Sequence, residues 1–183
     1  MAYARQYDVG EVKGMLMIAE GSANVTSFRV FSARQAVRGK VAHIANAPVA
    51  HSGSLHSGQT ANALSTRVDT GPQTASTFKD FDTLVLATTE GLNHANGQAA
   101  LALLDGGALD ATFRAPLAGN KYYGSRSSRV GKKGSGVSVN EPFLVASEVF
   151  VKVVRFIAGR LWVQTSYPSQ LNARPAPDLQ SLL

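Results

Sequence analysis

Two short segments, far apart in the chain, carry side chains able to move a proton and to hold a phosphoryl anion. The first contains His51 and His56 in a stretch rich in Gly and Ser, and reaches Arg67. The second, near the C-terminus, contains Thr165 and Tyr167. Imidazole has an unperturbed pKa of about 6.5, so its neutral and protonated forms are both available near neutral pH. The forked donors of a guanidinium match the oxygens of a phosphate.

RNA cleavage is a reaction that such a set of groups can catalyse without a metal ion. RNA carries its own nucleophile, the 2′-hydroxyl beside each phosphate. Cleavage requires a base for the hydroxyl proton, an acid for the leaving 5′-oxygen, and donors for the charge that develops on the phosphate. Histidine suits the first two roles and arginine the third. Thr and Tyr hydroxyls can orient the phosphate or the histidine.

Each candidate also has a simpler interpretation. His51 and His56 could be exposed loop residues, and Arg67 could be a solvated helix residue. Thr165 and Tyr167 share one face of a strand because strand side chains alternate, and both types are common in strands. The His-x₄-His spacing, without nearby carboxylates or cysteines, is not a standard metal-ligand pattern, so no metal site is predicted. The other histidines lack supporting neighbours and are interpreted as structural or exposed: His43 and His94.

The composition fits one folded domain with a polyanionic partner. The 183 residues are 44% hydrophobic, and 18 Lys and Arg against 12 Asp and Glu give a net charge of +6. The charge is uneven: residues 114–160 hold nine basic and two acidic side chains, whereas residues 61–110 hold two basic and six acidic ones. A solvated surface is the simpler interpretation for any single lysine. The basic residues predicted to bind the partner are Arg126, Arg129, Lys132 and Lys133.

The absence of cysteine excludes disulfides, thiolate catalysis and cysteine-based zinc sites. No apolar run approaches the length of a membrane span, and no charged-then-apolar signal peptide begins the chain. If the protein leaves its cell, we therefore expect it to do so by another route or as part of a longer chain.

Local patterns predict helical elements early and an antiparallel sheet late, an α+β fold. A short helix is expected over 60–68, with Thr60 as N-cap and a stop at 71–72, and another over 98–104, ended by 106–107. Residues 81–88 fit either a strand or a helix start, and residues 1–47 cannot be assigned. The later predictions are an extended segment at 108–115, a polar loop at 124–136, strands at 143–145 and 149–157, a turn at 158–159 and a returning strand at 160–167.

Four motifs follow one another between His51 and Pro168. They are His51-x₄-His56-Ser57-Gly58-Gln59-Thr60 with Arg67 eleven residues later, Ala75-Ser76-Thr77-Phe78, Val151-Lys152-Val153-Val154-Arg155 with its turn, and Thr165-Ser166-Tyr167-Pro168. In this order and spacing the chain resembles the bacterial RNase A-like toxin domain at the C-termini of CdiA contact-dependent inhibition proteins and other polymorphic toxins. The resemblance covers about two thirds of the chain.

The resemblance implies a metal-independent endoribonuclease that needs no cofactor and leaves a 2′,3′-cyclic phosphate. It implies catalytic roles for His56, Arg67, Thr165 and Tyr167, with His51 as the candidate second member of an acid/base pair. The implied fold is a twisted antiparallel sheet with packed helices, RNase A-like but without disulfides. The implied divisions are an N-terminal segment of uncertain role at 1–47, the toxin domain at 48–168 and a tail at 169–183.

The chain departs from the family pattern in three places, one of which is the central basic region, where the two are hard to align. Val-Gly-Lys of the family becomes Ser57-Gly58-Gln59 here, which removes a lysine, and residues 1–47 have no counterpart.

The implied partners are RNA and a cognate acidic immunity protein. A larger delivery system is expected to carry the domain, as a monomer, into the cytoplasm of a target cell. Tyr122, Tyr123 and Trp162 could stack on bases, although core packing fits Trp162 better. The alternative is a non-enzymatic nucleic-acid-binding or virion structural protein.

Overall fold

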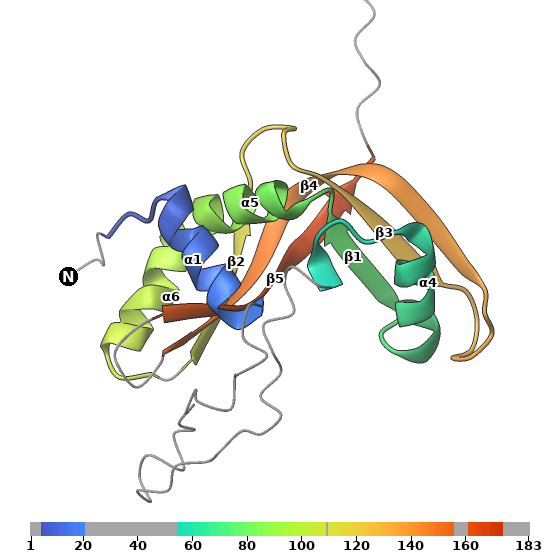
Figure 1. Ribbon diagram of the computed structural model, residues 1–183, viewed down its shortest axis with the longest axis horizontal. Helices are drawn as coiled ribbons and strands as arrows, with labels where there is room; N and C mark the ends of the chain where they lie inside the picture. Colours follow the sequence, from blue (N-terminus) through green and yellow to red (C-terminus); the bar gives the residue numbers. More distant parts are fainter. Residues whose placement is uncertain (1–4, 21–54, 109, 156–160, 174–183) are drawn as a thin grey trace, which may run out of the picture.

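The computed structural model describes residues 5–20, 55–108, 110–155 and 161–173, which form an α+β fold built on an antiparallel sheet (Figure 1). None of the described helices is long and apolar enough to cross a bilayer. The elements are, in chain order, α1 (Val9–Glu20), α4 (Ala61–Thr70), β1 (Thr74–Phe78), α5 (Phe81–Asn93), α6 (Ala95–Asp105), β2 (Asp110–Pro116), β3 (Tyr123–Arg129), β4 (Ser138–Arg155) and β5 (Leu161–Asn172).

The long strand β4 joins the two lobes seen in Figure 1. Its first half pairs with β3, which in turn pairs with β1, and α4 packs on these strands. Its second half pairs with β2 and with β5, and α1, α5 and α6 lie in this lobe. All of these strand pairs are antiparallel. The sheet therefore connects the early motifs on α4 and β1 with the late motif on β5.

The main core lies between the second half of the sheet and its helices. Val149 of β4 is fully buried, and a Cβ added to Gly91 of α5 would come within 2.7 Å of its Cγ1, so α5 rests directly on the strand. Val12 and Leu16 of α1 have no exposed surface and belong to the same cluster. Part of the segment 1–47 is therefore integrated into the folded body, which its sequence pattern did not reveal.

Helix α4 begins and ends where the sequence predicts. The hydroxyl of Thr60 accepts a hydrogen bond from the N–H of Ala63 at 3.2 Å, which caps the first turn. The N–H of Gly71 donates to the carbonyl of Arg67 at 2.8 Å and closes the last turn. Buried Leu64 and Val68 pack on Ala75 of β1 in a second, smaller core. This anchoring sets where Arg67 lies.

The prediction of a polar loop over 124–136 is wrong for its first half, which is strand β3. Gly124 permits the close pairing with β1, because an added Cβ would lie 2.4 Å from the carbonyl oxygen of Thr77. Ser127 is small and fully buried. Arg126 pairs with Glu141 through two hydrogen bonds of 2.7 and 2.9 Å. A polar strand is thus stabilised by close approach and by an ion pair, neither of which local composition reveals.

Three further elements differ from the sequence prediction or complete it. Residues 81–88 begin helix α5, capped by Asp80, whose carboxylate accepts from the N–H of Thr83 at 2.8 Å. The strands expected at 143–145 and 149–157 are one continuous strand, β4. The predicted antiparallel pairing of β4 with the strand after it is confirmed, while its turn at 158–159 lies outside the described residues.

Candidate active site

His56 is buried between the first strand and the last. Its side chain is 7% exposed, and its Nδ1 lies 3.0 Å from the carbonyl oxygen of Ser76 in β1. Because a carbonyl oxygen can only accept, Nδ1 carries the proton, and the neutral tautomer has its lone pair on Nε2. This tautomer is the one that can act as a base through Nε2. The interpretation of His56 as an exposed loop residue does not fit this burial.

The last strand brings an aromatic ring to the same histidine. The ring of Tyr167 lies with its centroid 5.0 Å from that of His56, at an interplanar angle of 34°. The Tyr167 ring also stacks on Phe150 of β4, with the centroids 4.8 Å apart. Thr165 is two residues earlier on β5 and is buried. The neighbouring Ser166 points the other way, because its hydroxyl bonds that of Thr88 on α5 at 2.8 Å. Thr165 and Tyr167 therefore share the sheet face that is turned away from α5.

Ser76 links the two halves of this arrangement. Its carbonyl accepts from His56, and its hydroxyl donates to the carbonyl of Pro168 at 2.9 Å. Pro168 directly follows Tyr167 on β5. A single residue of β1 thus holds the histidine on one side and the aromatic strand on the other. The sequence marked Ser76 as part of a motif but not as a positioning residue.

Arg67 approaches from α4 and is tied to the segment that carries His56. Its Nη1 donates to the carbonyl oxygen of Leu55 at 2.5 Å. The guanidinium is half-buried, and burial lowers the pKa of Arg67 from its ordinary value. The group stays charged at neutral pH because the ordinary pKa of arginine is far above 7. With five N–H donors, it can hold Leu55 and still present donors to an anion.

A lysine that sequence reasoning left out lies on the same face. Lys152 of β4 is directly opposite Thr165 in the strand pairing, just as Phe150 is opposite Tyr167. Its ammonium lies 3.7 Å from a carboxylate oxygen of Asp110 on the neighbouring strand β2. The signal in the sequence was alternation, because Lys152 interrupts a run of valines that otherwise face the core.

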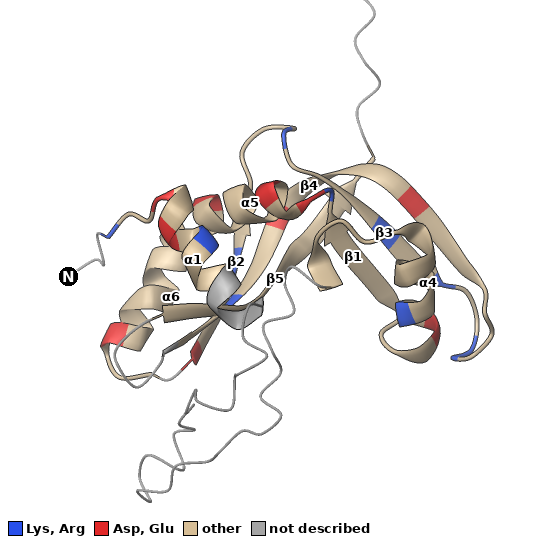
Figure 2. Ribbon diagram, in the orientation of Figure 1, with Lys and Arg blue, Asp and Glu red and all other residues tan. Residues whose placement is uncertain are grey.

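The predicted site residues are thus partly brought together. His56 contacts Tyr167, Arg67 holds the residue before His56, and Thr165 shares the face of Tyr167. His51 lies outside the described residues. The predicted substrate-binding residues lie on β3 and on the loop at 130–137, in the lobe that also contains α4 and β1, and Figure 2 colours the basic positions of this loop blue. They are Arg126, Arg129, Lys132 and Lys133.

The two arginines of that group are engaged within the fold. Arg126 pairs with Glu141, and Arg129 donates through Nη1 to the carbonyl oxygen of Val68 at 2.7 Å. The two lysines are exposed on a loop that the end of α4 holds in place, since Asp69 accepts hydrogen bonds from the backbone of Gly134 and Gly136. Lys132 and Lys133 are therefore better placed than the arginines to meet a polyanion in solution.

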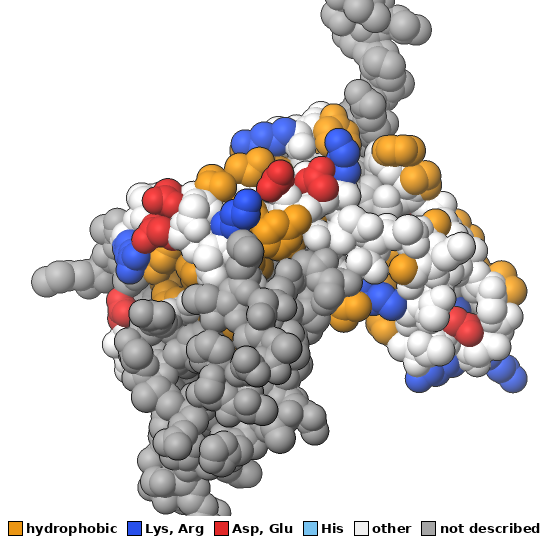
Figure 3. Space-filling view, in the orientation of Figure 1, with side chains coloured by type: hydrophobic (Ala, Val, Ile, Leu, Met, Phe, Trp, Pro, Cys, Tyr) orange, Lys and Arg blue, Asp and Glu red, His pale blue; other side chains and the backbone are white. Residues whose placement is uncertain are grey.

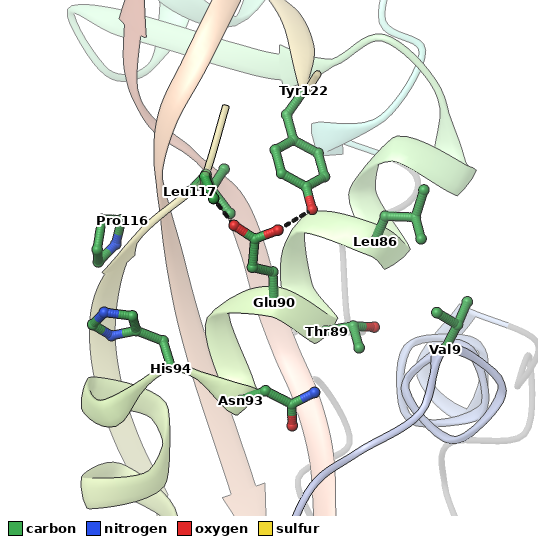
Figure 4. Close-up of a pocket in the computed structure, with 10 residues that line it drawn as sticks. Val9, Leu86, Thr89, Glu90, Asn93, His94, Pro116, Leu117 and Tyr122 are labelled. Atoms are coloured by element: carbon green, nitrogen blue, oxygen red, sulfur yellow. Dashed lines mark hydrogen bonds between the residues drawn. The ribbon is translucent and has the colours of Figure 1, made fainter. Parts of the chain in front are cut away.

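A pocket separate from the His56 site lies between α1, α5 and the segment after β2 (Figure 4). Its volume is about 590 Å³, and its polar centre is Glu90, which accepts from the hydroxyl of Tyr122 and the N–H of Ala118 and pairs with Lys121 at 3.1 Å. Burial opposes ionisation of Glu90, but these hydrogen bonds outweigh it and lower the pKa of the carboxyl. Burial, followed by the bond to Glu90, raises the pKa of Tyr122 to about 12.

This pocket contains none of the predicted site residues. Its histidine, His94, caps α6 by accepting from the N–H of Asn96 at 3.2 Å, in line with the structural interpretation. The carboxylate that could do chemistry there is engaged in holding the chain after β2 to α5. Among the residues that the structure describes, no three His, Asp or Glu side chains are grouped to hold a metal ion.

The chain has no match among protein-family models or among curated protein sequences. Among solved structures, it is similar to a chain of the crystal structure of a CdiA-CT/CdiI complex from Y. kristensenii 33638, with a TM-score of 0.42 and 19% sequence identity. The match covers 63% of this chain and 95% of that chain.

Proposed function

We propose that this protein is a metal-independent endoribonuclease toxin, with an RNase A-like site, that acts in competition between bacteria. His56 is the base that takes the proton of the 2′-hydroxyl through Nε2. The 2′-oxygen attacks the phosphorus, the bond to the 5′-oxygen breaks, and the leaving oxygen takes a proton from His51, the proposed second member of the acid/base pair, or from solvent. Arg67 binds the phosphate and the charge that develops on it. Thr165 and Tyr167 hold the phosphate or orient His56, and Lys152 adds positive charge to the same face.

The observation that carries the proposal is the packing of His56 against Tyr167, with Ser76 hydrogen-bonded both to His56 and to Pro168, the residue after Tyr167. Three motifs that lie far apart in the sequence meet at these contacts. A buried histidine whose Nδ1 donates to a backbone carbonyl is held in one tautomer, as a general base requires. A nucleic-acid-binding structural protein would use the exposed lysines but would have no need for this arrangement.

The proposed biological setting follows from the family resemblance and from charge. The domain is delivered by a larger toxin system into the cytoplasm of a target cell, where RNA is its substrate. The producing cell is protected by a cognate immunity protein. The surface of the immunity protein is expected to be acidic, because complementary charge speeds association with a basic partner. Expression of the chain alone should arrest growth, and co-expression of the immunity protein should restore it.

The direct test is RNA cleavage by purified protein in the presence of EDTA. Wild type should cleave single-stranded RNA and leave 2′,3′-cyclic phosphate ends, and His56→Ala should reduce the rate by at least 100-fold, in the range expected for loss of a general base. His94→Asn is the matched control, because it removes an imidazole but leaves a residue that caps helices well. Full activity of His56→Ala would overturn the mechanism, and loss of wild-type activity in EDTA would overturn metal independence.

A further inference from the structure

A small pocket beside the His56 segment carries an exposed aromatic ring. Its volume is about 190 Å³, and its lining includes Gln59, Thr77, Lys79, Tyr123 and Phe143. We propose that this pocket binds one unpaired nucleobase of the RNA strand whose phosphate lies at His56, with Phe143 as the stacking surface. The inference rests on the proposed ribonuclease function and adds a base-binding subsite to it.

Phe143 combines two unfavourable features that call for a reason. The residue is 74% exposed, and its backbone has a φ of 58°. A bulky residue other than glycine rarely adopts this left-handed conformation, and such strain is concentrated at functional sites. Figure 3 shows hydrophobic side chains exposed on the rim of the lobe that contains β3 and the first half of β4. An exposed, strained ring is explained if it contacts a ligand.

A β-bulge turns this ring toward the pocket. Gly124 pairs with Leu144 and Arg126 pairs with Glu141, so Ser125 of β3 lies opposite two residues of β4, Pro142 and Phe143. A bulge of this kind redirects side chains, and it is one of the few places where a strand accepts proline. The bulge therefore places Phe143 at the edge of the pocket instead of in the alternating pattern of the strand.

The pocket lies within one short chain segment of the proposed base. Gln59 follows His56 by three residues, and three extended residues span at most about 10 Å. The segment is held along β1, since the N–H of Gly58 donates to the carbonyl of Phe78 at 3.0 Å and that of Gln59 to the hydroxyl of Thr77 at 3.4 Å. Neighbouring residues of β1 therefore contact both places: Ser76 accepts from His56, and Thr77 and Phe78 line the pocket.

The chemistry of the lining suits a single base. Its volume is below the range of about 300–1,000 Å³ that holds drug-sized ligands, which favours one planar heterocycle over a whole nucleotide. Unpaired RNA bases are recognised by stacking on aromatic rings and by hydrogen bonds to their edges. Phe143 and Tyr123 supply rings, Lys79 supplies a cation, and Gln59 adds a polar side-chain amide, whose Nε2 donates to the carbonyl of Ser57 at 3.3 Å.

The test is a calorimetric titration of the purified chain with the four nucleoside 3′-monophosphates and with inorganic phosphate. Phe143→Gly removes the ring at a position whose backbone favours glycine, and Phe143→Leu keeps an apolar side chain without a π-face. Both should weaken binding of the preferred nucleotide about tenfold, toward the low end for base stacking, and leave phosphate binding unchanged. Phe143→Trp keeps an aromatic ring at this position and should bind the nucleotide as wild type does.

Val139→Ala is the matched control, because Val139 lies on the same strand and is 53% exposed; it should bind nucleotides as wild type does. Unchanged nucleotide affinity in both Phe143→Gly and Phe143→Leu would overturn the base subsite, even if RNA cleavage depends on His56. If nucleotide binding depends on Phe143 but RNA is not cleaved, the subsite stands and the ribonuclease function fails. Equal weakening of inorganic phosphate would also overturn base stacking.

Discussion

The ring of His56 lies 5.0 Å from the ring of Tyr167, although the two residues are separated by most of the described chain. One belongs to the segment before α4 and the other to the last strand. The contact packs an imidazole ring against a phenol ring on the sheet face turned away from α5. Each ring has a further contact that fixes it: His56 hydrogen-bonds the carbonyl of Ser76, and Tyr167 stacks on Phe150.

Tyr167→Phe separates the packing role of this residue from that of its hydroxyl. The ring contacts remain, so stability should change by less than about 0.5 kcal/mol. Loss of a hydrogen bond to a charged group should lower kcat/KM for RNA about 10- to 100-fold. Tyr122→Phe is the control, because it removes a phenol hydroxyl that bonds Glu90 in a pocket without the predicted site residues; it should lower the melting temperature but not kcat/KM. Full activity of Tyr167→Phe would exclude a role for the hydroxyl.

Ser76→Ala tests the link between the two halves of the site. It removes the hydrogen bond to Pro168 but keeps the carbonyl that accepts from His56. We expect a loss of about 1 kcal/mol in the free energy of unfolding and a several-fold lower kcat, because β5 is less firmly placed. Thr74→Ala, at the exposed end of the same strand, removes a weaker contact with Ser128 at 3.4 Å. Equal effects of the two substitutions on kcat would contradict the positioning role.

Arg67→Lys keeps the positive charge and removes the forked donors. Because lysine cannot hold Leu55 and a phosphate in the same planar geometry, kcat/KM should fall at least tenfold. The comparison is Arg114→Lys, at an exposed ion pair of 3.5 Å with Glu148, which should have normal activity. If Arg67→Lys lowers stability but leaves kcat/KM of the folded protein unchanged, Arg67 is a structural residue and not a phosphate ligand.

Lys132 and Lys133 are expected to contact RNA phosphates. For single-stranded RNA, each phosphate contact contributes about 0.7 to the slope of log K against log salt concentration. Replacing both with alanine should therefore reduce the slope by about 1.4, measured with an uncleaved 2′-deoxy oligonucleotide. Lys13→Ala, on α1 in the other lobe, should leave the slope unchanged. An unchanged slope in the double variant would show that the loop does not meet the polyanion.

Glu90 should contribute acid-sensitive stability. Its pKa is lowered in the folded state, so its contribution is fully present above the unfolded value of about 4.3 and is lost as the pH falls through the folded value. Glu90→Gln should reduce the free energy of unfolding at pH 7 by about 1–2 kcal/mol, and the difference from wild type should vanish in acid. Glu11→Gln, which disrupts an exposed ion pair with Arg5, should change stability by less than about 0.5 kcal/mol. A difference that persists in acid would contradict the linkage.

Local signals in the sequence were sufficient for elements with caps and strong alternation. The ends of α4 could be predicted from Thr60 and Gly71, because capping depends on residues within one turn. The pairing of β4 with β5 could be predicted from runs of β-branched residues beside a turn signal. The strand character of 123–129 was missed because it depends on Glu141 and on the close approach of β1. The bulge at Phe143 was missed too, although Pro142 within a strand-like run is its sequence signal.

The sequence by itself determined the chemical types of the candidate site and their order along the chain, because motif spacing is a property of one dimension. It also determined the positive charge and the absence of cysteine. Only the tertiary structure decided that His56 is buried, which tautomer it holds, and that Tyr167 and Ser76 meet it, because these depend on pairings between distant strands. It likewise brought Lys152 opposite Thr165 and placed Phe143 beside Gln59, since strand register and a bulge are set by the partner strand.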